Sequence, residues 1–333
     1  MSWEVREGDV LARLGEMPDC SVQTAITSPP YWGLRDYGQD GQLGLEESPD
    51  LYVANMVRVF REVRRVLRDD GTLWLNLGDS YAGSWGAQGR TSTLEGGSMI
   101  SARQIEAHPK GKTRTGSIPA GSGLKNKDLV GIPWRVAFAL QADGWYLRSD
   151  IIWSKPNPMP ESVTDRPTKA HEYLFLLSKS ARYFYDADAV REEFADERQG
   201  NPGDYARRSS FDKGANNDRQ DLGFIGDGGG WTKGAENGGR NKRTVWTVAT
   251  APFKGAHFAV FPPKLIEPCV LAGTKPGDLI LDPFSGSGTT GMVALRHDRS
   301  YVGIELNPEY AAMSRDRIRD DAPLLNTGLE VAA

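Results

Sequence analysis

The pattern of apolar and polar residues predicts a β–α–β unit near the start of the chain. Residues Val22–Thr27 form a short apolar run typical of a buried strand, and prolines follow it directly. After Ser48-Pro49, a typical helix start, apolar side chains recur at helical spacing as far as Leu67. We expect the Asp-Asp-Gly sequence at 69–71 to end that helix, and residues 72–77 to form the next strand.

The remaining order is predicted in two further blocks. The first holds a helix at 133–141 and strands at 146–153 and 172–178. The second holds a helix at 263–272, a strand at 279–281, a helix to about 296, a strand at 301–305 and a helix after Asn307-Pro308. Only 45 residues follow Gly288 in the 333-residue chain, too few for a complete doubly wound sheet. The missing strands must therefore come from the amino-terminal half.

Two stretches lack periodicity. Residues 81–126 are rich in Gly, Ser and Thr, and residues 98–127 carry six Lys or Arg against the single acid Glu106. Residues 198–243 carry nine Lys or Arg against six Asp or Glu. We expect a mobile basic loop at about 82–127 and little independent core in the second stretch.

Composition leads us to expect a soluble, cytoplasmic protein rather than a membrane or disulfide-rich protein. The net charge is −4, 39% of residues are hydrophobic, and 38 Gly and 20 Pro indicate long loops. The first residues have no apolar signal segment, and no apolar run is long enough to span a bilayer. Cys20 and Cys269 stand without CxxC or HExxH spacing, so we expect no disulfide and no metal site.

A glycine-rich segment near the end, residues 282–290 (DPFSGSGTT), predicts a ligand loop between a strand and a helix. Its GxGxxG match, with Glu305 19 residues beyond Gly286, also allows a dinucleotide dehydrogenase or a turn with no ligand. Asp282 at the strand end, Phe284 as a packing aromatic and Glu305 as an acceptor for ribose hydroxyls suit a nucleoside better than a pyrophosphate. No GK[ST] follows, which disfavours a P-loop.

Glycine at 286 and 288 is expected to let the backbone approach the ligand closely. Ligands of doubly wound sheets lie outside the carboxyl ends of the strands. We therefore expect the strand ending at Thr27 to lie beside the strand ending at Asp282. The glycine loop comes late in the sequence, after residues 28–31, which form the second candidate loop. This order implies a circularly permuted fold.

The second candidate is the loop Ser28-Pro29-Pro30-Tyr31. Pro has no N–H, so the carbonyls of Ser28 and Pro29 point outward on a fixed backbone, and the Ser28 hydroxyl can donate or accept. Tyr31 offers a face for stacking a base. Acceptors that engage both N–H bonds of an exocyclic amine help to localise its lone pair toward a methyl donor, without a metal or a strong base. Taken alone, such a loop is more often a stiff turn.

Together these motifs resemble the permuted β-group of DNA amino-methyltransferases. The resemblance rests on residues 27–33, 75–79, 153–157 with 171–172, 257–262 and the glycine loop. It implies a Rossmann-like methyltransferase fold, a doubly wound, mostly parallel sheet with one antiparallel strand and an irregular target-recognition insert. It implies S-adenosylmethionine as cofactor, bound by Asp9, Asp282, Phe284, Gly286, Gly288, Thr289 and Glu305. Asp9 would contact the adenine ring, or it simply caps the following helix.

The resemblance further implies double-stranded DNA as substrate and Ser28, Pro29, Pro30 and Tyr31 as catalytic residues. The serine form is associated with N4-cytosine enzymes, whereas N6-adenine enzymes usually carry Asp or Asn at that position. The target base would be flipped out of the duplex. We expect a catalytic half at 1–185, a target-recognition region at 186–256 and a cofactor half at 257–333. A cognate restriction endonuclease is a partner that the resemblance allows.

Several alternatives stay open. N6-adenine methylation is the nearest, and a non-catalytic DNA-binding protein with this fold is more distant. Glutamine methyltransferases share the Pro-Pro-Tyr loop but normally carry Asn at position 28 and the unpermuted order. The sequence does not assign Asp79, Lys155, Asn157, Arg166 or His171 to the site or to structural roles, although a core role is favoured for His171. Trp32 contacts the base or lies in the core.

Overall fold

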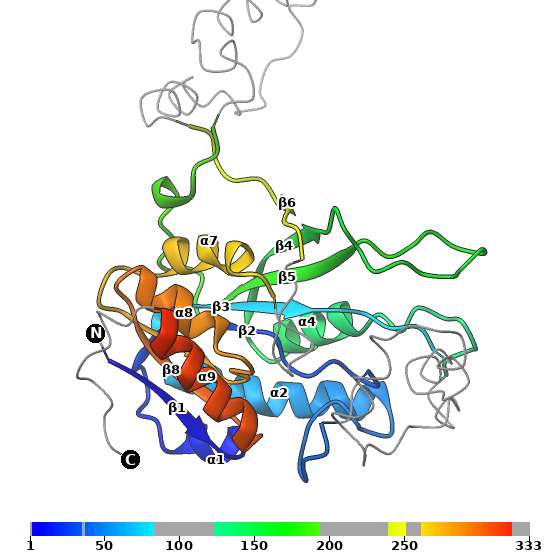
Figure 1. Cartoon of the computed structure of the whole chain (residues 1–333), viewed down its shortest axis with the longest axis horizontal. Helices are drawn as coiled ribbons and strands as arrows, with labels where there is room; N and C mark the ends of the chain where they lie inside the picture. Colours follow the sequence, from blue (N-terminus) through cyan, green and yellow to red (C-terminus); the bar gives the residue numbers. More distant parts are fainter. Residues whose placement is uncertain (1, 35–36, 83–122, 194–238, 251–260, 322–333) are drawn as a thin grey trace, which may run out of the picture. The chain divides into compact units, whose positions relative to one another are not determined.

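The described strands form one eight-stranded sheet with helices packed against it (Figure 1). The structure is a computed structural model that describes residues 2–34, 37–82, 123–193, 239–250 and 261–321. The strand order is β1-β8-β7-β2-β3-β5-β4-β6. Strand β5 runs antiparallel to its two neighbours β3 and β4, and the other pairings are parallel. The expected mostly parallel sheet with one antiparallel strand is confirmed.

The strands are β1 (Trp3–Glu7), β2 (Val22–Thr27), β3 (Leu67–Leu77), β4 (Tyr146–Ser154), β5 (His171–Ser178), β6 (Val245–Thr247), β7 (Leu279–Asp282) and β8 (Ser300–Glu305). The helices beside them are α1 (Val10–Gly15), α2 (Pro49–Val66), α4 (Ile132–Ala142), α7 (Pro263–Gly273), α8 (Thr289–Arg296) and α9 (Pro308–Asp321). Strand β6 is an element that the sequence pattern did not predict, because three residues give no periodicity.

The two faces of the sheet are covered by different helices, as strand alternation requires. Ala25, Leu73 and Leu75 belong to the core formed with helices α1, α2 and α4. Thr24 and Thr72 point to the other face, where a Cβ on Gly273 of α7 would lie 3.2 Å from each hydroxyl. Helices α7 and α2 therefore lie on opposite faces (Figure 1).

The permuted order is visible in the sheet. Strand β2 pairs with β7 in parallel, with Ala25 opposite Leu281, although the two are separated by most of the chain. The predicted adjacency of the strands ending at Thr27 and Asp282 is confirmed. The loop after β2 and the glycine loop after β7 consequently leave the same edge of the sheet.

One boundary was predicted wrongly. Helix α2 ends at Val66, and β3 begins at Leu67 rather than at residue 72. Leu67 pairs with Val22 and Thr72 with Thr24, so residues between them bulge out of the ladder. At Gly71 a Cβ would lie 3.0 Å from the carbonyl oxygen of Gln23, so the glycine serves a close strand contact instead of ending the helix.

The chain separates into two compact units, Met1–Phe184 with Thr244–Ala333, and Tyr185–Arg243. In the described part of the second unit, Glu192 pairs through its backbone with Arg240, and its carboxylate contacts Arg243 at 2.9 Å. The division at 1–185, 186–256 and 257–333 stays a prediction. Most of the expected basic loop at 82–127 and most of the recognition region lie outside the described residues, as do residues 257–260. No described helix has the length and apolar character needed to cross a bilayer.

Candidate active site

A cavity of about 640 Å³ lies at the edge of the sheet where the parallel strands end. Its volume is in the range of small-molecule sites. Of the predicted site residues, the cavity is lined by Asp9, Ser28, Pro29, Pro30, Tyr31, Asp282, Phe284, Gly286, Thr289 and Glu305. Gly288 is not part of this lining. The two loops that the sequence singled out thus face one space.

Asp282 joins the two loops. Its carboxylate accepts hydrogen bonds from the hydroxyl of Thr27 at 2.7 Å, the hydroxyl of Thr290 at 2.6 Å and the backbone N–H of Phe284 at 3.1 Å. Burial raises the pKa of Asp282 to about 6, and these hydrogen bonds oppose that shift. Because Thr27 directly precedes Ser28, this carboxylate fixes the start of the Ser-Pro-Pro-Tyr loop against the glycine loop.

Glu305 fixes the middle of the glycine loop. Its carboxylate accepts from the backbone N–H of Gly286 at 2.8 Å and from that of Asn307 at 2.9 Å. Burial raises the pKa of Glu305, although the backbone donors oppose the shift. Each carboxylate oxygen has a further lone pair, so acceptor capacity remains at the cavity wall.

The two glycines of the loop differ. Gly286 lines the cavity with a φ of +52°, a conformation that favours glycine. Gly288 has a φ of +76°, but a Cβ there would lie 2.4 Å from the buried Oγ of Ser314 in α9. The missing side chain of Gly288 makes room for α9. The expected approach of its backbone to a ligand stays a prediction.

Asp9 has the position that the resemblance implies, after a strand that pairs with β8. Its carboxylate accepts from the backbone N–H of Ala12 at 3.0 Å and so caps helix α1. It also lines the cavity. Both interpretations of Asp9 are compatible with this placement, and its contact with a ligand stays a prediction.

Core residues hold the loop that contains Ser28 in place. The hydroxyl of Tyr52 in α2 donates to the carbonyl of Pro30 at 2.9 Å. Trp32 is 1% exposed and donates from its indole nitrogen to the carbonyl of Glu46, so it is a core residue. Ser28 and Tyr31 line the cavity instead.

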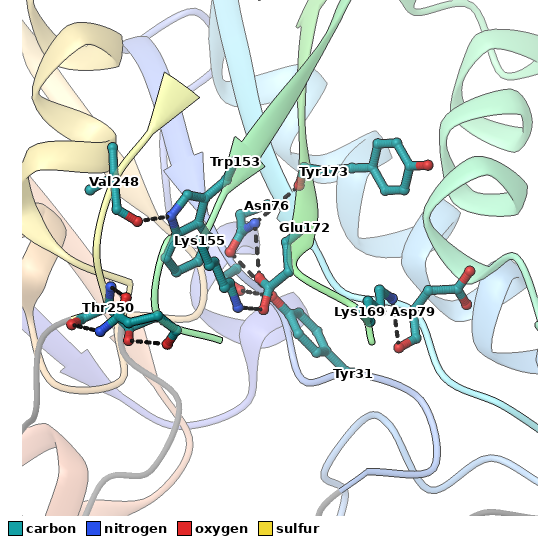
Figure 2. Close-up of polar contacts among 12 residues, drawn as sticks. Tyr31, Asn76, Asp79, Trp153, Lys155, Lys169, Glu172, Tyr173, Val248 and Thr250 are labelled. Atoms are coloured by element: carbon teal, nitrogen blue, oxygen red, sulfur yellow. Dashed lines mark hydrogen bonds and ion pairs between the residues drawn. The ribbon is translucent and has the colours of Figure 1, made fainter. Parts of the chain in front are cut away.

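A polar network surrounds the hydroxyl of Tyr31 (Figure 2). The hydroxyl of Tyr31 donates to the carboxylate of Glu172 at 2.8 Å and lies 3.1 Å from Oδ1 of Asn76. Ser28 Oγ lies 3.2 Å from the same hydroxyl. Burial, followed by the negative charge of Glu172, raises the pKa of Tyr31 well above its ordinary value. The phenol therefore stays protonated.

Lys155, the residue that follows strand β4, completes this network. Its ammonium group pairs with Glu172, and both side chains are less than one-fifth exposed. The same ammonium lies 4.2 Å from the centre of the Trp153 ring. Glu172 lies between Lys155 and Tyr31 (Figure 2). Lys155 thus belongs to the cavity wall rather than to a simple turn.

The other unassigned residues have structural contacts near the cavity. Asp79 accepts from the backbone N–H groups of Gly131 and Ile132 and so caps α4. Asn157 hydrogen-bonds the backbone N–H and carbonyl of Thr250. Arg166 pairs with Glu161 at 2.7 Å and lies 3.8 Å from the centre of the Tyr81 ring.

His171 is not the core residue that the sequence favoured. It is half-buried, lines the cavity and lies edge-on to Tyr173, with ring centres 5.3 Å apart. Burial, followed by the charge of Lys169, lowers its pKa. The neutral ring is therefore favoured at this position.

Sequence reasoning missed the site roles of Asn76, Gly78 and Glu172. A Cβ on Gly78 would lie 2.5 Å from the ring of Tyr31, so glycine there makes room for that ring. Asn76 and Gly78 lie at the end of β3. Their place at a strand end was a signal from which the sequence could have predicted a site role. Glu172 lies at the start of β5, and it reaches the site because that strand is antiparallel. Among the described residues, no group of three or more candidate ligand side chains could hold a metal ion.

The fold and the site define a class: a permuted methyltransferase fold, with a glycine loop and a Pro-Pro-Tyr loop on one cavity. The model of the N6/N4 family described as DNA methylase matches residues 22–316, and the chain belongs to this family. It is 49% identical over 315 residues to the type II methyltransferase M.Cfr9I of Citrobacter freundii, covering 95% of this chain and 87% of the relative.

Solved structures share the fold. The PvuII DNA methyltransferase (cytosine-N4-specific) matches with a TM-score of 0.59 at 19% identity, over 98% of this chain and 93% of that one. TTHA0409, a putative DNA modification methylase of Thermus thermophilus complexed with S-adenosyl-L-methionine, matches with a TM-score of 0.54 at 22% identity, over 97% of each chain. At these identities the likeness concerns the fold alone.

Proposed function

We propose that this DNA methyltransferase transfers a methyl group from S-adenosylmethionine to the exocyclic N4 amine of a cytosine flipped out of duplex DNA. One observation carries the proposal: the loop 28–31 and the glycine loop face one cavity, tied together by the 2.7 Å hydrogen bond between Thr27 and Asp282. Holding two reactants in line can lower a barrier by about 7–11 kcal/mol.

The cavity wall near the glycine loop suits an adenosyl cofactor. Glu305 keeps acceptor capacity for ribose hydroxyls, Phe284 offers an aromatic surface, and Asp9 offers a second carboxylate. When bound, S-adenosylmethionine would supply a methyl group on a positively charged sulfur, which would leave with the electron pair of the broken carbon–sulfur bond. The amine nitrogen would bond to the methyl carbon and release one proton to solvent. Gly286 and Thr289 complete the proposed cofactor contacts.

The opposite wall suits a flat base with an amino group. Neither Pro29 nor Pro30 has an N–H that would compete for the acceptors of the loop. The Ser28 hydroxyl and the Pro29 carbonyl are the proposed acceptors for the two amine hydrogens. The ring of Tyr31, packed against Gly78, is the proposed stacking surface.

We favour cytosine over adenine as the target base because residue 28 is Ser. A serine loop is the form that the resemblance associates with N4-cytosine enzymes. Methylation of the N6 amine of adenine is the second candidate, since the same acceptors fit either amine and the N6/N4 family covers both. Residues 186–256 are the proposed target-recognition region. The type II methyltransferase name of the relative favours a cognate restriction endonuclease as partner.

Product identification tests the proposal. Genomic DNA from a host that lacks the gene is incubated with the purified protein and S-adenosylmethionine, digested to nucleosides and analysed by mass. We expect N4-methylcytosine, absent when Ser28→Ala replaces the wild-type protein. N6-methyladenine would establish the second candidate, and no methylated nucleoside would refute both.

Modified-base sequencing of the same DNA adds the sequence context of each methylated base. We expect the modification to be confined to one short recognition sequence. Methylation scattered without a common context would contradict site specificity.

A further inference from the structure

The hydrogen bonds around Tyr31 have a direction that the chemistry of the groups determines. The carboxylate of Glu172 pairs with the ammonium group of Lys155, and a carboxylate oxygen in such a pair can only accept a hydrogen bond. The amide nitrogen of Asn76 lies 3.0 Å from the carbonyl of Tyr173, so its Oδ1 faces the hydroxyl of Tyr31. Both neighbours of the phenol on this side are therefore acceptors.

Tyr31 has one hydroxyl hydrogen, which these acceptors occupy. The 2.8 Å distance to Glu172 Oε2 is shorter than the 3.1 Å distance to Asn76 and is typical of O–H···O hydrogen bonds. The raised pKa of Tyr31 keeps that hydrogen on the phenol. The phenol oxygen can then only accept from Ser28, whose hydroxyl lies 3.2 Å away.

Ser28 is left with its lone pairs. Its single hydrogen is directed to Tyr31, and the residue lines the cavity. An amine presents N–H donors, so a serine whose hydrogen points away from the cavity has the correct polarity to receive one. A freely rotating hydroxyl would spend part of its time with its hydrogen turned toward the amine.

We propose that Glu172, held by Lys155, is a positioning residue that directs the hydroxyl of Tyr31 and thereby keeps Ser28 as a hydrogen-bond acceptor for the target amine. The inference rests on the proposed function and adds to it the residue that sets the polarity of Ser28. It also gives a role to Lys155, which neutralises a carboxylate that is less than one-fifth exposed.

A double-mutant cycle between Glu172→Gln and Tyr31→Phe tests this chain of hydrogen bonds. The phenol is the only link between Glu172 and Ser28 in the proposal, so Tyr31→Phe cuts it while keeping the ring. The readouts are the single-turnover methylation rate, the KM for DNA, the cofactor Kd by titration calorimetry and the midpoint of thermal unfolding.

We expect Glu172→Gln alone to lower the methylation rate about tenfold, an effect typical of one hydrogen bond to a charged group. The KM and the cofactor Kd should stay within about twofold, since this effect acts in the chemical step. In the Tyr31→Phe background, Glu172→Gln should cause no further loss. Glu62→Gln, whose carboxylate pairs with Arg65 on the outside of α2, is the matched control and should keep the wild-type rate.

Glu172→Gln leaves Lys155 without its charged partner, and a folding defect would show in the midpoint of thermal unfolding. In that case the paired change Glu172→Met with Lys155→Met takes the place of Glu172→Gln in the cycle, because the paired change removes both charges together. It should show the same rate loss and the same dependence on Tyr31.

Losses that multiply in the double mutant, or a rate unchanged by Glu172→Gln, would overturn the role of Glu172 while leaving the proposed function intact. A wild-type protein without methylation of cytosine or adenine would overturn the proposed function and the inference with it.

Discussion

The two walls of the cavity are built differently. On the glycine-loop wall, the carboxylates of Asp282 and Glu305 accept from hydroxyls and backbone N–H groups of the protein itself, and Asp282 is 1% exposed. On the opposite wall, Tyr31, Glu172 and Lys155 form a network of long side chains from the loop after β2, from β5 and from the end of β4. The first wall joins strands and loops and is the proposed cofactor side; the second carries Ser28, the proposed acceptor for the target amine.

This difference teaches where substitutions should act. Groups of the first wall join strands and loops beside the proposed cofactor site, so their loss should appear in stability or cofactor affinity. Groups of the second wall are proposed to orient Ser28, so their loss should appear mainly in turnover. Four variants break or sharpen this contrast.

The largest effect is expected for Ser28→Ala. Removing one preorganised hydrogen-bond partner of the reacting group typically costs about 100- to 1000-fold in turnover. We expect this loss in kcat with an unchanged cofactor Kd, measured by a tritiated-methyl assay and titration calorimetry. Ser21→Ala, at a serine that donates to the carbonyl of Pro18, is the control. Equal losses of turnover and cofactor affinity would show that Ser28 belongs with the first wall.

Asp282→Asn should change the pH dependence of stability. The folded pKa is raised from 3.8 to about 6, so between these values the folded state binds more protons than the unfolded state. Stability therefore falls as pH rises through this window and then levels, by about 3 kcal/mol in total at 1.36 kcal/mol per unit. The variant should lack this decline.

Urea unfolding at pH 4 and pH 7 measures this decline in the free energy of unfolding. The contribution of Asp282 is the difference between the declines of the wild type and the variant. Asp316→Asn, whose side chain is 69% exposed on α9, is the matched control. Parallel pH profiles for wild type and Asp282→Asn would contradict the assignment of the decline to this carboxyl.

Gly288→Ala should destabilise the fold more than it weakens the cofactor site. The added Cβ meets Ser314, and overpacking of this kind typically costs about 1–3 kcal/mol beyond the cost of the left-handed backbone. Gly277→Ala has a similar φ of +88° with open space around the Cβ, so it isolates the backbone cost. The two unfolding free energies should differ by about 2 kcal/mol. Equal values would show that α9 yields to the new methyl group.

Gly78→Ala is expected to have the smallest effect, and it acts on turnover. Its Cβ would displace the ring of Tyr31 and lengthen the hydrogen bond to Glu172, which we expect to lower kcat about tenfold. The cofactor Kd should stay unchanged. Gly15→Ala, at a helix end with no heavy atom near the new Cβ, should keep the wild-type kcat. A weakened cofactor site in Gly78→Ala would break the contrast between the walls.

Much of the fold could be predicted because its signals act over a few residues. The run Val22–Thr27, the helix start at Ser48-Pro49 and the glycine loop were each predicted correctly from local pattern. The start of β3 was not, because Leu67 is extended only through its pairing with Val22. Strand β6 was missed for the same reason, since its three residues are ordered by pairing with β4.

The sequence by itself determined most of the elements, their permuted order and the two loops that face the cavity, because apolar periodicity, Pro and Gly constrain the backbone locally. Only the tertiary structure decided which side chains meet there. Glu172 lies 141 residues from Tyr31 and reaches it because β5 enters the sheet antiparallel, bringing its first residues to the edge where β2 and β3 end. The tertiary structure also decided that Gly288 faces α9, because the direction of a missing side chain depends on what packs against it.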